Sequence, residues 1–61
     1  MSPQTLAYIF GKCAEFWGIS ITKVEEEYNS SLFTITEQDP RTYRIDHQSR
    51  PDLVIIIEDE G

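Results

Sequence analysis

The chain has 61 residues, a formal net charge of −6 and a single cysteine, Cys13. A domain of this size buries only about 60% of the surface that its unfolded chain exposes, so it needs tight packing, a disulfide, a metal or a partner. One cysteine excludes an internal disulfide, and one cysteine with one histidine excludes an ordinary four-ligand zinc site. We therefore expect a single domain over residues 1–61 that has no cofactor or metal and relies on packing or oligomerisation.

The charge balance excludes two broad classes of partner. Acidic residues outnumber basic ones by 11 to 5, which disfavours generic attraction to nucleic acids or anionic membranes. The longest apolar run, 53–57, is far shorter than the about 20 residues of a membrane helix, and the N-terminus lacks the features of a signal peptide. A lone thiol is typical of a reducing compartment. We expect a cytoplasmic protein without a membrane span.

Residues 3–17 have the pattern of an amphipathic helix. Ser2 is a suitable N-cap, Pro3 suits the first helical position, and Gly18 is a suitable terminator. The apolar residues recur at steps of three and four, as one helical face requires. They are Leu6, Ile9, Phe10, Cys13, Phe16 and Trp17.

Residues 19–28 fit two structures. As a strand, the segment places Ile19 and Ile21 on one face, shifts phase before Val24, and turns back at residues 29–30. As a helix, it would be capped by Thr22, and the side chain three residues later would complete a capping box. We favour the strand, because the segment begins with Ile-Ser-Ile-Thr, which is typical of strands.

Three later segments, 32–36, 43–47 and 53–57, are rich in β-branched and aromatic residues and are separated by turn signals at 39–41 and 49–52. The predicted fold is therefore α+β, with one N-terminal amphipathic helix packed on a four-stranded antiparallel sheet in the order α-β-β-β-β.

The last predicted strand, Leu53-Val54-Ile55-Ile56-Ile57, does not alternate with polar residues. Successive side chains of a strand point to opposite faces, so this strand is apolar on both. Its odd-numbered residues continue the face that the helix covers. Val54 and Ile56 then lie on the opposite face, where we predict a self-association surface and a homodimer.

No arrangement in the sequence predicts catalysis. Asp46 and His47 are neighbours on a strand, so they point to opposite faces and do not form a relay. Cys13 belongs to the apolar helix face, where cysteine acts as a small hydrophobe. Arg41, Arg44, His47 and Arg50 recur every third residue, and we interpret the arginines as surface residues paired with nearby aspartates. We expect a protein that is not an enzyme.

A resemblance to the helix-turn-helix motif gives an alternative function. Ala14, Gly18, Ile19 and Val24 have the spacing of that motif, which implies a DNA-binding regulator. Its second helix would carry three consecutive glutamates, which the phosphates of DNA repel. Direct binding of nucleic acid is therefore the alternative and not the main prediction.

The main functional prediction rests on two acidic triplets and one aromatic residue. We expect a small acidic protein-binding module, an inhibitor or adaptor that docks on a basic surface of a partner protein, for example a surface that binds nucleic acid. Tyr8, on the polar side of the helix, is the added contact residue. The alternatives are the regulator above and a structural subunit of a larger assembly. The expected contact residues are Tyr8, Glu25, Glu26, Glu27, Glu58, Asp59 and Glu60.

Overall fold

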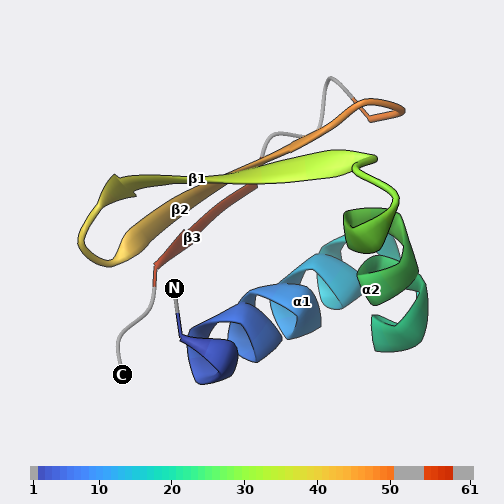
Figure 1. The fold of residues 1–61 in the computed structure, drawn as a ribbon, viewed down its shortest axis with the longest axis horizontal. Helices are drawn as coiled ribbons and strands as arrows, with labels where there is room; N and C mark the ends of the chain where they lie inside the picture. Colours follow the sequence, from blue (N-terminus) through green and yellow to red (C-terminus); the bar gives the residue numbers. More distant parts are fainter. Residues whose placement is uncertain (1, 51–54, 59–61) are drawn as a thin grey trace.

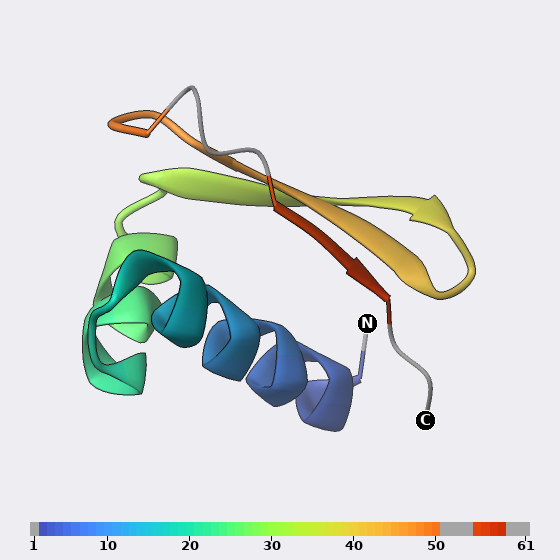
Figure 2. The ribbon, with the colours of Figure 1, turned by 180° about the vertical axis from the view of Figure 1, so that it is seen from behind.

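The computed structural model describes residues 2–50 and 55–58, which form two helices followed by an antiparallel sheet of three strands. Both helices lie on one face of the sheet, and no described residue covers the other face (Figures 1 and 2). No helix in this part of the chain is long and apolar enough to cross a membrane. The elements are α1 (Pro3–Trp17), α2 (Ile21–Asn29), β1 (Phe33–Asp39), β2 (Thr42–His47) and β3 (Ile55–Glu58).

Helix α2 corrects the predicted fold. The α+β class holds, but the order is α-α-β-β-β and the sheet has three strands instead of four. The N-cap is Ser20, whose side chain accepts a hydrogen bond from the backbone N–H of Lys23 at 3.1 Å, and not Thr22. Val24 and Glu27, one helical turn apart, are both buried. Capping and packing therefore override the strand preference of the first residues.

Helix α1 forms as the sequence predicts. The Ser2 side chain accepts from the backbone N–H of Thr5, and Gly18 ends the helix in the left-handed conformation with φ of 68°. The N–H of Gly18 donates to the carbonyl of Ala14 at 2.9 Å. One residue of the expected apolar face departs from it, because Phe16 is 67% exposed.

The predicted hairpin turn at residues 29–30 is instead the end of α2. The backbone N–H of Ser30 donates to the carbonyl of Glu26 at 3.0 Å, as at a helix C-terminus. Ser31 follows with φ of 59°, and the N–H of Leu32 donates to the carbonyl of Glu27 at 2.9 Å. These bonds turn the chain directly into β1.

The sheet forms from the three later segments, and Ile55 and Ile57 of β3 face the helices, as predicted. Its strand order is β1-β2-β3, so β2 is the central strand. Ile45 lies opposite Ile35 of β1 and Ile55 of β3, and Tyr43 lies opposite Ile57. These side chains face the helices, whereas Leu53 and Val54 of the predicted run lie outside the described residues. Strand β1 extends to residue 39, beyond the predicted end at residue 36.

The core lies between the sheet and the two helices. Ile9, Cys13, Val24 and Ile45 are completely buried there, so both helices and the central strand contribute to one cluster. Burial raises the pKa of the Cys13 thiol to about 12. Because the thiolate is the reactive form, Cys13 is an inert core residue in the folded chain.

Candidate functional site

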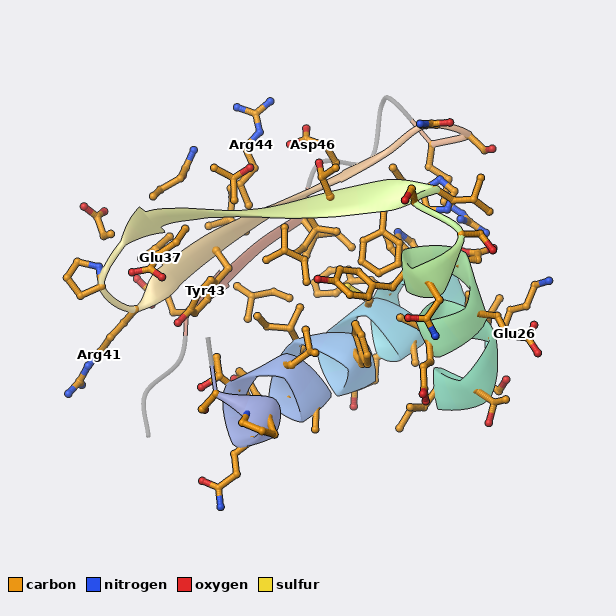
Figure 3. All side chains as sticks on the ribbon, viewed as in Figure 1. Glu26, Glu37, Arg41, Tyr43, Arg44 and Asp46 are labelled. Atoms are coloured by element: carbon orange, nitrogen blue, oxygen red, sulfur yellow. The ribbon has the colours of Figure 1, made fainter. Side chains whose placement is uncertain are left out.

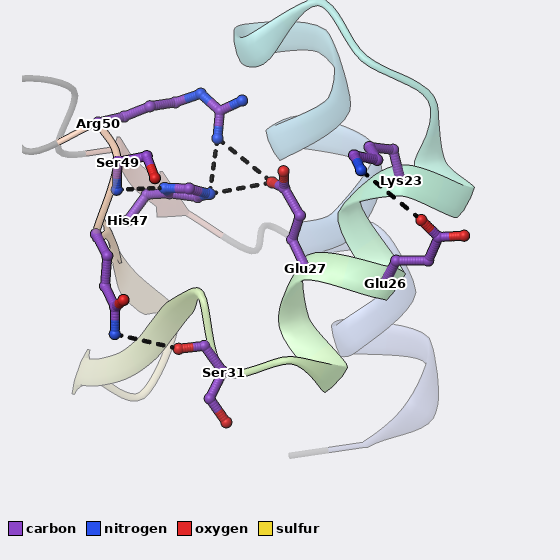
Figure 4. A network of polar contacts seen from close by, with 8 residues as sticks. Lys23, Glu26, Glu27, Ser31, His47, Ser49 and Arg50 are labelled. Carbon is purple, nitrogen blue, oxygen red and sulfur yellow. Dashed lines mark hydrogen bonds and ion pairs between the residues drawn. The ribbon is translucent and has the colours of Figure 1, made fainter.

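A buried cluster of three ionisable side chains joins α2 to the end of β2 (Figure 4). Glu27 comes from α2, His47 is the last residue of β2, and Arg50 follows three residues later. Glu27 Oε1 is 3.0 Å from His47 Nε2 and 3.3 Å from Arg50 Nη1. The side chains of Glu27 and His47 are only 10% and 2% exposed. The cluster therefore brings together residues about twenty positions apart in the sequence.

The bond from Ser49 is the contact that assigns a tautomer to His47. The backbone N–H of Ser49 donates to His47 Nδ1 at 3.0 Å, so Nδ1 carries no proton and the proton of the neutral ring is on Nε2. Nε2–H then donates to Glu27. Arg50 Nη1 lies 2.7 Å from the same Nε2, although both nitrogens are donors. The Glu27 carboxylate accepts from both, and its charge allows the two donors to lie this close (Figure 4).

Trp17 connects the last turn of α1 to this cluster. Its ring centroid is 5.0 Å from that of His47 in an edge-on arrangement, and Arg50 Cζ lies 5.0 Å from the centroid of the same ring. The second contact has the distance of a cation–π interaction. The indole Nε1 is buried and has no hydrogen-bond partner in the described part of the chain. Side chains from α1, from α2 and from the end of β2 therefore meet at the cluster.

The charge of Glu27 is maintained by its neighbours. Burial raises the pKa of Glu27, but the hydrogen bond from His47 and the positive charge of Arg50 outweigh burial, and the pKa lies below its ordinary value. Glu27 is therefore ionised at neutral pH. The geometry supports a structural role for this cluster, which holds α2 against the sheet.

The structure divides the acidic triplet at residues 25–27. Glu25 and Glu26 are exposed on α2, and Glu26 projects away from the molecule (Figure 3) and lies 3.9 Å from the Lys23 ammonium. Glu27 points inward to His47, so it is unavailable to a partner and leaves the set of expected contact residues. Sequence reasoning missed this because it did not place Glu27 on the helix face of Val24.

Two of the other expected contact residues, Tyr8 and Glu58, lie away from α2. Glu58 is the exposed last residue of β3, which ends beside the start of α1, whereas α2 lies beyond the end of α1 (Figure 1). The hydroxyl of Tyr8, which is exposed, donates to the backbone carbonyl of Glu58 at 3.2 Å. Asp59 and Glu60 lie outside the described residues. The two acidic triplets thus do not form one continuous surface in the described part of the chain.

The uncovered face of the sheet is mainly polar. Arg44 Nε donates to Asp46 Oδ1 at 3.2 Å, and both side chains project from this face (Figure 3). Ile56 lies opposite Arg44 and is 52% exposed, as predicted for the polar side of the sheet. Val54, its expected companion, lies outside the described residues. Within the described ranges, no three His, Cys, Asp or Glu side chains are positioned to hold a metal ion.

The two helices also meet the first requirement of the helix-turn-helix alternative. Ala14 and Val24 are buried, and the chain turns between them at Gly18. The outward side of α2 nevertheless carries more acidic than basic side chains. Its exposed residues after the first are Thr22, Lys23, Glu25, Glu26 and Asn29.

Taken together, these features define a two-layer α+β domain with a buried charged cluster and an acidic surface. No protein family, curated protein or solved structure matches the chain. The function of the chain is therefore inferred from the chemistry of its exposed residues.

Proposed function

We propose that the chain is a small acidic protein-binding module that docks on a basic surface of a partner protein in the cytoplasm, as an inhibitor or an adaptor. The observation that carries this proposal is an excess of exposed carboxylates over cations. Lys12, Lys23 and Arg44 are each matched by a neighbouring carboxylate. Among the described residues, Glu25, Glu37, Asp39 and Glu58 are exposed and have no ion-pair partner, against Arg41 as the unmatched exposed cation.

The exposed carboxylates of α2 are the best candidates for the docking surface. Glu25 and Glu26 are adjacent on a helix whose position is fixed by the Glu27 cluster, so their carboxylates are presented on a rigid element. Opposite charges accelerate encounter and select the partner, more than they increase affinity. Association should therefore slow as added salt screens these charges.

A charge-reversal experiment tests this proposal. The probe is a lysine-rich peptide, and its association rate is measured at low and at physiological salt. We expect the double variant Glu25→Lys/Glu26→Lys to bind at least about tenfold more slowly at low salt. The matched control is Glu37→Lys/Asp39→Lys, which changes the net charge equally on the β1–β2 hairpin. Equal losses in both double variants, or binding that does not respond to salt, would contradict the proposal.

A DNA-binding regulator remains the second candidate, because two helices joined at a left-handed glycine precede the strands. The acidic outward side of α2 disfavours it. A mobility-shift measurement with mixed-sequence DNA separates the two candidates. If the chain retards the DNA at physiological salt and Lys23→Ala abolishes this effect, the regulator is favoured over the acidic module.

We also propose that two copies of the chain associate through the uncovered side of β3. Ile56 is a large apolar side chain exposed on an edge strand of the sheet, where unpaired backbone groups can accept a further strand. This contact is separate from the acidic docking surface on α2, because α2 packs on the opposite face of the sheet (Figure 1).

A further inference from the structure

Helix α1 carries an apolar hollow beside the start of α2. Its volume is about 490 Å³. Ala7, Gly11 and Ala14 line it at steps of four and three, so small residues follow one another along the helix. A Cβ atom added at Gly11 would meet no atom within 4 Å. Over these turns the backbone of α1 is therefore open to close approach by another molecule.

Larger apolar side chains border this hollow. Tyr8 lines it from α1, and Ile19 and Ile21 line it from the turn and the start of α2. Ile21 is 54% exposed although it is aliphatic and adjoins other apolar groups. These side chains adjoin one another, so they form one small, open apolar surface. We call the surface formed by residues 7, 8, 11, 14, 19 and 21 the α1 groove.

The charges at the border of the α1 groove indicate what fits it. Glu15 lines the groove. Lys12, whose ammonium is 3.8 Å from the Glu15 carboxylate, is the cation among the lining residues. Glu25 follows Ile21 by four residues, so it lies one turn further on the same side of α2. It has no ion-pair partner among the described residues. An occupant with basic residues beside its apolar surface would complement this border.

A helix suits the shape of the groove better than an extended segment. Small residues allow two helices to approach closely, and the lining residues of α1, from Ala7 to Glu15, run along the helix for about two turns. Amphipathic helices commonly bind by placing apolar residues, spaced three and four apart, into such a groove. A second copy of this chain is disfavoured at the α1 groove, because it would bring the same carboxylates, Glu15 and Glu25, to the border.

We propose that the α1 groove binds an amphipathic helix of a partner protein. The apolar side of that helix fills the groove, and its lysine or arginine residues contact Glu15 and Glu25. This inference rests on the proposed function and specifies the kind of element that the acidic module recognises.

Three synthetic peptides serve as probes. The first contains leucine and lysine at helical spacing, the second has the same composition in alternating order, and the third replaces lysine by glutamate at helical spacing. Binding of each labelled peptide is measured by fluorescence anisotropy. We expect the first peptide to bind saturably and at least about tenfold more tightly than the second, and the third not to bind.

Two variants locate the binding in the groove. Gly11→Trp fills the hollow, and we expect it to weaken binding of the first peptide at least about tenfold. Thr22→Trp adds the same bulk on the outward side of α2 and should bind like the unmodified chain. Ile21→Gln, a change at an exposed position, provides a second test if Gly11→Trp does not fold, which circular dichroism reports.

The outcomes separate this inference from the proposed function. Equal binding of both lysine peptides, unaffected by Gly11→Trp and Ile21→Gln, would overturn the groove inference but leave docking by charge. Equally tight binding of the glutamate peptide would overturn both. A dimer that Gly11→Trp dissociates in sedimentation experiments without peptide would assign the groove to a second copy and overturn the inference.

Discussion

At the scale of single residues, Glu26 and Glu27 show how strongly position on a helix decides the role of a side chain. The two are adjacent and chemically identical, yet Glu26 is exposed and Glu27 is buried against His47. Burial of an unpaired carboxylate is strongly unfavourable, so Glu27 is tolerated only because His47 and Arg50 both donate to it. Removal of the charge should leave two donors facing each other at 2.7 Å.

We therefore predict that Glu27→Gln destabilises the fold by about 1–3 kcal/mol, because the charge-assisted bonds to His47 and Arg50 are lost or weakened. The control is Glu26→Gln, which breaks an exposed ion pair and should change the free energy of unfolding by about 0.5 kcal/mol or less. Urea unfolding measures both. Equal effects of the two variants would show that the buried cluster adds nothing to stability.

The effect of Glu27→Gln on the free energy of unfolding should depend on pH. Since the pKa of Glu27 lies below its ordinary value of 4.5, its stabilising contribution is complete above that pH and is lost as the pH falls through the lowered pKa. The difference in unfolding free energy between the original chain and Glu27→Gln should thus be constant near neutral pH and shrink in acid. A difference that grows on acidification would contradict the assigned charge.

At the scale of elements, the sequence predicts α1 and the three described strands but not α2. Helix α1 has an apolar face, an N-cap and a terminating glycine that all agree. The strand segments are rich in β-branched and aromatic residues and are separated by turn signals. Residues 19–28 give conflicting signals, since Ile19 to Thr22 favour a strand while Val24, Glu27 and Tyr28 have helical spacing. The conflict is settled by the Ser20 cap and by packing against α1, and the local sequence does not encode that packing.

The cap of α2 provides a direct test of this element. We predict that Ser20→Ala costs about 1 kcal/mol, because the backbone N–H of Lys23 loses its acceptor. Thr22→Ala, at an exposed position inside the helix, should change stability by about 0.5 kcal/mol or less. Denaturant unfolding of both variants measures the difference. A larger loss for Thr22→Ala would indicate the strand, in which a β-branched residue is favourable.

At the scale of the whole molecule, the contact among the residues of the charged cluster could not be predicted, although each of these residues stood out in the sequence. Arg50 and His47 stood out by their regular spacing, and Glu27 by its acidic neighbours. Their meeting requires α2 to be a helix and β2 to end at His47, so an error in one element hid the whole arrangement. The exposure of Glu25 and Glu26, in contrast, depends only on local pattern and was predictable.

Within the described residues, one face of the sheet and the outer edge of β3 are uncovered, and we predict that two copies of the chain associate there. Ile56→Lys should give a folded monomer, because it places a charge on the apolar contact proposed between two copies. Thr36→Lys, across Arg44 in the same row of the sheet, should leave the dimer intact. Sedimentation equilibrium measures the mass. A chain that is monomeric before substitution, or a variant that unfolds, would contradict the proposed dimer contact.

Trp17 gives the molecule an internal optical reporter. It is the chain's single tryptophan, and its ring touches both His47 and Arg50. Indole emission moves to longer wavelengths when water reaches the ring. The intrinsic fluorescence of the chain therefore reports the opening of the contacts that join α1, α2 and β2, without any added label.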